Sequence, residues 1–211
     1  NYESKGSTWS PLEKSIGVGG WGLTVQGYFD NFSLSMDAYN NRFFGLTDKP
    51  NYFSHEQGLS WVGNDPEGEQ FDFDVTNLKL SYDYKAITFE MGKFKRHWGP
   101  GHSSLILSSK APTFPQFGFN WDINSNINFE YFHASLRSLM KDDINSAVYE
   151  GIGAEVPEYN RYLVGHRIDW NLSENLIIGA SETLVYGLRN IDLLYLLPFA
   201  PFLSLQQYKG D

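Results

Sequence analysis

Alternation of apolar and polar residues, repeated in segments of about ten residues, is the feature that most limits what this chain can fold into. Trp21, Leu23 and Val25 share one face of such a segment, whereas Gly22 and Thr24 share the other. A side-chain period of two belongs to β-strands, in which neighbouring residues point to opposite faces. The pattern therefore predicts an all-β fold, with strands at residues 20–29, 32–38, 77–84, 87–91, 126–136, 161–172 and 176–187.

The connections between these segments alternate between short and long. Turns at residues 30–31, 85–86 and 173–175 join neighbours into hairpins, whereas a connection from about residue 40 to residue 70 separates the first hairpin from the next. This alternation is typical of an up-and-down transmembrane β-barrel. A soluble β-sandwich also has alternating strands, but the repeated contrast between apolar and polar faces favours the barrel. We expect residues 1–211 to form one domain, an antiparallel partial barrel of about eight strands.

One predicted strand departs from this regularity. In residues 126–136, Ile127, Phe129 and Tyr131 alternate with polar residues, and the phase then changes to Phe132 and Ala134. A β-bulge would produce such a change. We therefore predict a bulge near Phe132.

The composition narrows the possible functions. Aromatic residues make up 17% of the chain and charged residues 19%, against roughly 25% charged residues in typical soluble domains. The net charge of -9 argues against a nucleic-acid partner, because phosphate binding requires concentrated Lys and Arg. The absence of cysteine excludes disulfides and thiolate chemistry. The longest apolar stretch, residues 191–205, is broken by Asp192, Pro198 and Pro201, and a membrane helix needs roughly 20 apolar residues.

The sequence MGKFKRHWGPGHSSLILSSKA at residues 91–111 is the most distinctive part of the chain. A predicted strand there runs into Gly99, Pro100 and Gly101, and the two glycines permit the positive φ angles of a sharp turn. The motif WGPGHSSLILSSKAP, with the MGKFKR strand before it, resembles the central signature of the Wzi-like capsule assembly family of outer-membrane proteins. The stretch YLLPF at residues 195–199 is similar to a second element of that family.

The resemblance implies a bacterial outer-membrane barrel of about eighteen strands that holds capsular polysaccharide as a lectin, without catalysis. Such a barrel needs roughly 400 residues, so we expect the chain to be about half of one, with closure as a small eight-stranded barrel as an alternative. The best-known members of the family begin with a helical plug, and the first residues of this sequence show no pattern that predicts such a plug. The turn is expected to be structural, with Arg96, His97, Trp98, Gly99, Pro100, Gly101, His102, Ser103 and Ser104 as its residues.

Catalysis and metal binding are the competing interpretations of this motif. His102 beside Ser103 and Ser104 suggests a nucleophilic hydrolase, such as an outer-membrane phospholipase. However, the chain has no Gly-x-Ser-x-Gly elbow, and no third orienting group can be assigned. His97 and His102 lie near each other without a carboxylate at ligand spacing, so we expect no metal and no cofactor. An inward-folded structural loop is favoured over an active site.

The charged residues of the strands are predicted to line a polar barrel interior. Unpaired charge there would be costly, so structural ion pairs are favoured over a strip of basic residues that selects a ligand. The predicted interior bases are Lys93, Lys95, Arg96, Arg137, Arg161 and Arg167, and their predicted partners are Glu90, Glu130 and Asp169.

The aromatic residues fall into two predicted groups. Trp21, Tyr82, Tyr84 and Trp170 are expected at the boundary between lipid and water, where rings with a polar tip are favourable. Rings in the long 40–70 connection are better placed to stack on sugars, with amides and carboxylates nearby as hydroxyl partners. The candidate carbohydrate ligands are Tyr52, Phe53, Trp61, Asn64 and Asp65.

The sequence thus predicts a non-enzymatic outer-membrane barrel that binds or organises capsular or surface polysaccharide. Its expected partners are that polysaccharide and outer-membrane lipid. A passive pore or structural barrel would share every strand feature, and a soluble carbohydrate-binding β-sandwich is the remaining alternative.

Overall fold

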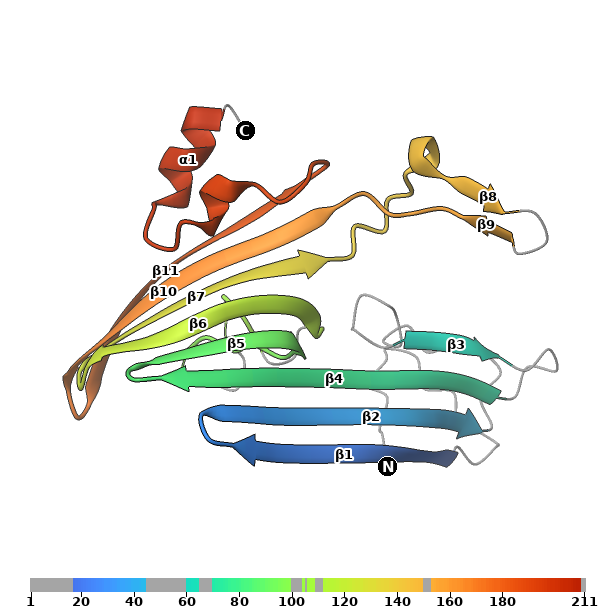
Figure 1. The fold of residues 1–211 in the computed structure, drawn as a ribbon, viewed down its shortest axis with the longest axis horizontal. Helices are drawn as coiled ribbons and strands as arrows, with labels where there is room; N and C mark the ends of the chain where they lie inside the picture. Colours follow the sequence, from blue (N-terminus) through green and yellow to red (C-terminus); the bar gives the residue numbers. More distant parts are fainter. Residues whose placement is uncertain are drawn as a thin grey trace, which may run out of the picture.

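The computed structural model of the chain describes residues 17–44, 60–64, 70–99, 104, 106–108, 112–149 and 153–209. In these residues one antiparallel sheet dominates, with eight strands in the up-and-down order β1-β2-β4-β5-β6-β7-β10-β11 (Figure 1). A further strand, β3, pairs with β4, and β8 and β9 form a separate small hairpin. The prediction of an all-β, up-and-down antiparallel fold is confirmed.

The strands of the large sheet are mostly longer than a typical soluble strand of five or six residues. They are β1 (Gly17–Phe29), β2 (Phe32–Phe44), β3 (Ser60–Asn64), β4 (Gln70–Tyr84), β5 (Ile87–Phe94), β6 (Phe114–Asn124), β7 (Ile127–Leu136), β10 (Arg161–Ser173) and β11 (Leu176–Gly187). The remaining elements are η2 (Asp143–Asn145), β8 (Ala147–Tyr149), β9 (Gly153–Glu155), η3 (Leu193–Leu196) and α1 (Phe202–Lys209).

Short turns and long connections lie at opposite ends of the strands. Two-residue turns join β1 to β2, β4 to β5, β6 to β7 and β10 to β11, and all four lie at the left edge in Figure 1. Asp30 and Lys85, the first residues of two of these turns, have φ angles of 48° and 54°, as tight hairpin turns require. Because these strands alternate in direction, every longer connection leaves from the strand ends opposite the short turns.

The strand register gives the sheet two contrasting faces, because directly paired residues point to the same side. One face, called the apolar face, includes the row Leu34, Leu80, Met91, Phe117, His133, Val164 and Leu184. The other, called the polar face, includes the row Ser33, Ser81, Glu90, Gly118, Phe132, Gly165 and Thr183.

The large sheet is open in the residues that the structure describes. β1 pairs only with β2 and β11 pairs only with β10, so each leaves one edge without a neighbouring strand there. No second large sheet lies against either face in the described ranges, which is not the arrangement of a β-sandwich.

The structure corrects the prediction of a bulge near Phe132. β7 pairs with β10 from Ile127 to Leu136 without a register shift, and Phe132 and Ala134 lie on the polar face. Both are buried there, because a loop packs over them. A strand that is buried on both faces has apolar residues at consecutive positions. In the sequence, these consecutive apolar residues look like a change in the phase of the alternation. An irregularity occurs instead in β6, between Asp122 and Asn124.

Several elements were not among the predicted ones, namely β3, β6, β8, β9, η2, η3 and α1. β6 contains the alternating aromatics Phe117, Phe119 and Trp121, but Pro115 and Gly118 weaken its strand signal. The helix α1 is only eight residues long, shorter than a helix that is stable alone. The long connection is also shorter than expected, because β2 continues to Phe44 and β4 begins at Gln70.

Candidate functional site

The apolar face forms a band of exposed side chains across the first five strands of the sheet. Leu23, Phe89 and Met91 are 56%, 45% and 57% exposed, although side chains of this size are usually buried in soluble domains. In β1 the band runs from Trp21 to Phe29. These residues are eight positions apart, which corresponds to about 27 Å along an antiparallel strand.

Most of the aromatic residues expected at a lipid–water boundary lie toward the two ends of this band. Tyr82 and Tyr84 lie toward the short turns, and Trp21 lies toward the strand ends with the long connections. Trp170 also lies toward the short turns, on β10, outside the band. Tyr84 and Trp170 are each 50% exposed. The positions fit the prediction, and the role itself remains a prediction.

A loop packs against the polar face over β5, β6 and β7. We call it the strap, meaning the described residues 95–99, 104 and 106–108. The Trp98 amide N–H donates to the Leu107 carbonyl over 2.9 Å, which holds the two limbs of the strap together. Trp98 is 1% exposed and packs edge-on against Phe132, with 5.3 Å between ring centroids. Leu107, Phe114 and Ala134 complete this small core.

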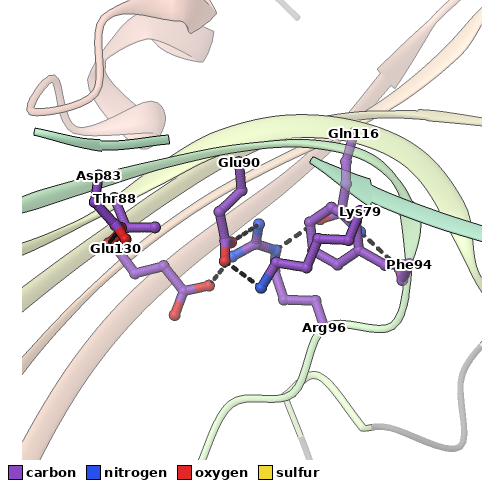
Figure 2. A network of polar contacts seen from close by, with 8 residues as sticks. All are labelled: Lys79, Asp83, Thr88, Glu90, Phe94, Arg96, Gln116 and Glu130. Carbon is purple, nitrogen blue, oxygen red and sulfur yellow. Dashed lines mark hydrogen bonds and ion pairs between the residues drawn. The ribbon is translucent and has the colours of Figure 1, made fainter. Parts of the chain in front are cut away.

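Arg96 anchors the strap through a buried network (Figure 2). Its Nη2 lies 3.2 Å from the Glu90 carboxylate, and its Nη1 donates to Glu130. Its Nε donates to Gln116 Oε1 over 2.7 Å, and the Gln116 amide donates to the Phe94 carbonyl over 2.7 Å. Each of the three guanidinium nitrogens therefore donates to an acceptor.

The charges of this network balance. Lys79 pairs with Glu90 from the neighbouring strand, so two cations face two carboxylates. Buried charge is tolerated only when it is paired and hydrogen-bonded. The arrangement is a structural ion network, because every charged group in it is occupied by another.

Two glycines make room for the strap. A Cβ on Gly165 would lie 2.7 Å from the Trp98 and Phe132 rings, so β10 can carry no side chain at the position where Trp98 packs. Gly99 has a φ angle of 107°, a conformation that side chains rarely allow. The predicted positive φ is therefore present at Gly99, whereas Pro100 and Gly101, which would complete the predicted turn, lie outside the described residues.

The predicted ion pairs form in part. Arg96 pairs with Glu90 and Glu130, and Arg167 pairs with Asp169 at 2.6 Å. Lys93 is not an interior residue, because its register with Leu78 and Pro115 places it on the apolar face. The sequence pattern missed this because the alternation of β5 was not extended to its last residues.

Arg137 also departs from the prediction. It lies after β7, in the connection to β8, and pairs with Glu158 at the strand ends that carry the long connections. The hydrogen bond from Arg137 lowers the pKa of Glu158 below its usual range. The Leu139 amide adds a 3.0 Å hydrogen bond to the same carboxylate. This pair braces a connection rather than the interior of the sheet.

Two of the candidate carbohydrate-binding residues lie at the strand ends that carry the long connections, and the other three are outside the described residues. Tyr52, Phe53 and Asp65 lie outside the described residues. Of Trp61 and Asn64 the backbone is described, in β3, where they pair with Phe73 and Phe71 of β4. The register shifts between Trp61 and Gly63.

The turn motif contributes structure at each of its described positions. Arg96 and Trp98 anchor the strap, and the His97 ring nitrogen lies 2.9 Å from the Gly99 carbonyl. The Ser104 hydroxyl accepts from the Ile106 amide over 3.2 Å, which shapes the returning limb. Pro100, Gly101, His102 and Ser103 lie outside the described residues, so the hydrolase interpretation is not tested.

The comparisons with known proteins give no relative. No protein-family model matches the chain, and neither the curated proteins nor the solved structures contain a significant match. The resemblance to the Wzi-like family therefore stays a prediction. Within the described ranges, no helix has the length and apolar character needed to cross a membrane.

Proposed function

We propose that this sheet is part of an outer-membrane β-barrel, with its apolar face against lipid, that holds surface polysaccharide without catalysing a reaction. The observation that carries the membrane part is the exposed band on the apolar face. A contiguous apolar surface of this kind marks an interaction site, and single scattered residues do not. The band height of about 27 Å along β1 is close to the roughly 25 Å apolar belt of outer-membrane barrels.

The connections support the same proposal. Short turns at one rim and long connections at the other are typical of bacterial outer-membrane barrels. A barrel must also satisfy every backbone group in lipid, so it requires strands that pair with the open edges of β1 and β11. The proposal therefore includes closure of the sheet through those edges.

The polysaccharide part rests on the resemblance and on the aromatic residues of the long connection between β2 and β4. Trp61 and Asn64 belong to β3, which pairs with the end of β4 farthest from the short turns. In a barrel this rim faces the cell exterior. Aromatic rings there offer apolar surfaces for sugars, and amides offer hydrogen bonds for hydroxyl groups.

The membrane part is tested by fractionation and heat modifiability. We expect the chain in the outer-membrane fraction, to be extracted only by detergent, and to migrate differently on gels before and after boiling. Release into the aqueous phase without detergent would contradict the proposal. That result would favour a soluble carbohydrate-binding protein.

The polysaccharide part is tested by retention of purified capsular polysaccharide on the immobilised protein. Trp61→Ala with Tyr52→Ala is expected to weaken retention while heat resistance in detergent is unchanged. Ile144→Ala, at an 87% exposed residue of another connection, is the matched control and should retain polysaccharide normally. Equal retention by all three proteins would reject these residues as ligands.

A passive pore is the second candidate, and the polar face favours it. Thr24, Asp37 and Thr88 on that face are hydrophilic and bonded to one another or to neighbours on the same face, as in a wet interior. Single-channel recording in planar bilayers separates the candidates. Steady conductance with no polysaccharide retention would favour the pore.

A further inference from the structure

The C-terminal segment, residues 188–209, packs against the apolar face over β7, β10 and β11 (Figure 1). It contains η3 and α1. The segment covers this part of the face, whereas the part over β1, β2, β4, β5 and β6 is bare.

The two parts differ along one cross-strand row of the apolar face. Direct pairing links Phe29, Phe32, Tyr82, Phe89, Phe119, Tyr131, His166 and Glu182 across all eight strands. Six aromatic residues are followed by two titratable ones. His166 Nε2 lies 3.3 Å from Glu182 Oε2. A carboxylate on a lipid-facing surface carries a desolvation penalty that this single contact does not offset.

The C-terminal segment satisfies Glu182. The carboxylate accepts the Phe202 amide through one oxygen and the Leu203 amide through the other, both over 2.8 Å. These amides open α1, where backbone N–H groups have no partner within the helix. The negative charge also lies at the positive end of the helix dipole.

Aromatic packing closes the cover over the row. The Phe202 ring stacks on His166 with 4.4 Å between centroids, and Phe202 is 1% exposed. Phe199 packs on Phe129 at 4.8 Å. Tyr195 is fully buried, and its carbonyl accepts the Tyr131 hydroxyl over 2.8 Å.

The outer side of the segment carries many large apolar side chains. Its exposed apolar side chains are Leu188, Ile191, Leu193, Leu197, Phe199, Leu203 and Tyr208, and the polar Asn190, Ser204, Gln207 and Lys209 are exposed as well. A groove of about 370 Å³ beside Phe199, lined by Phe129, Ile168 and Ala180 among others, matches one of about 340 Å³ on the bare part of the face. Exposed apolar side chains are therefore found both on the bare strands and on the segment.

We propose that the C-terminal segment is a lipid-facing cover, which seals the His166–Glu182 pair from acyl chains and presents its own apolar side chains to the bilayer. This inference rests on the proposed function, because it assumes that the apolar face meets lipid. The partner is the acyl chain of the surrounding membrane lipid, and a second protein chain is the alternative that the test separates.

Nitroxide labels in outer-membrane vesicles test the proposal, and the chain has no native cysteine to interfere. Leu203→Cys reports on the cover, Met91→Cys on the bare band and Ile144→Cys on an exposed connection. We expect collision with oxygen to exceed collision with a water-soluble nickel chelate at Leu203, as at Met91, and the reverse at Ile144. Water-like accessibility at Leu203 with lipid-like accessibility at Met91 would overturn the cover alone.

Two other outcomes are informative. Protection of Leu203 from both reagents would mean that another protein covers it, which also overturns the lipid assignment. Water-like accessibility at Met91 would overturn the proposed function, and the cover with it. A second variant, Glu182→Leu, should release α1 and raise label mobility at Leu203 several-fold without changing Met91. Unchanged mobility would contradict the role of Glu182.

Discussion

The strap and the C-terminal segment both fold back over the sheet, but on opposite faces and by opposite means. The strap brings a cation and an indole ring to the polar face, where Arg96 meets Glu90 and Glu130 and Trp98 covers Phe132. The C-terminal segment brings backbone N–H donors to the apolar face, where they meet Glu182. Each segment supplies what its face lacks.

The comparison also predicts different stabilities for the two segments. The strap is fixed by side chains that are almost entirely buried, with the Arg96 side chain 4% exposed. The C-terminal segment depends on a helix cap and on ring stacking, with many of its own residues exposed. We expect damage to the strap to affect the whole sheet and damage to the cover to stay local.

The largest effect is expected from Arg96→Met. Removing the cation leaves Glu130 without its ion-pair partner and Glu90 with Lys79 alone, and breaking a buried ion network costs about 3–5 kcal/mol. Denaturant unfolding in lipid vesicles measures this loss. The control is Arg137→Met, at an ion pair in a connection, for which we expect less than about 1 kcal/mol. Equal losses in the two variants would contradict the anchoring role of Arg96.

A smaller effect is expected from Gly165→Ala. The added methyl group meets the Trp98 and Phe132 rings, and overpacking of this kind costs about 1–3 kcal/mol. Gly27→Ala is the control, because nothing lies within 4 Å of its Cβ position. The loss should shrink when Trp98→Ala is also present, since the methyl group then fills space. Additive losses in the double variant would show that Trp98 does not pack on Gly165.

Glu182→Ala is expected to act locally. Loss of a side chain that caps a helix costs about 0.5–2 kcal/mol, and here the sheet itself keeps its pairing. Hydrogen exchange at the Phe202 and Leu203 amides should accelerate, while exchange in β4 and β5 stays slow. The exposed turn residue Glu174, changed to Ala, is the matched control. Faster exchange throughout the sheet would contradict the local character of the cover.

The smallest effect concerns pH. Lys209, whose Nζ lies 2.9 Å from Asp192 Oδ2, lowers the pKa of Asp192 below its usual range. A lowered pKa in the folded state gives stability above the unfolded pKa of about 4, and that stability is lost as the pH falls through the folded pKa. We expect label mobility at Leu203 to rise below about pH 4, and Asp192→Asn to remove part of that rise. An identical pH profile in the variant would exclude the pair as a cause.

Alternation predicted most strands because one side chain pattern governs each of them. In β1, Trp21, Leu23 and Val25 share the apolar face as expected, and β11 spans Leu176–Gly187 as predicted. The pattern failed where a second segment covers the sheet. Phe132 is apolar because Trp98 packs on it, and no local rule reveals that contact.

The candidate site was predictable to a similar degree. The pairing of Arg96 with Glu90 and Glu130 followed from the cost of buried charge, and the positive φ of Gly99 followed from the freedom of glycine to adopt it in a sharp turn. The role of Glu182 could not be predicted, because it depends on a helix twenty residues away that is too short to announce itself. Contacts made between distant segments were the missing information.

We propose that the two faces of the sheet meet different solvents, lipid on the apolar face and water on the polar face. Single cysteines at Leu78, Lys79, Leu80, Ser81 and Tyr82 in β4, each labelled with a fluorophore in vesicles that contain brominated phospholipid, test it most directly. We expect strong quenching at Leu78, Leu80 and Tyr82 and weak quenching at Lys79 and Ser81. Uniform quenching along these residues, or none, would contradict it.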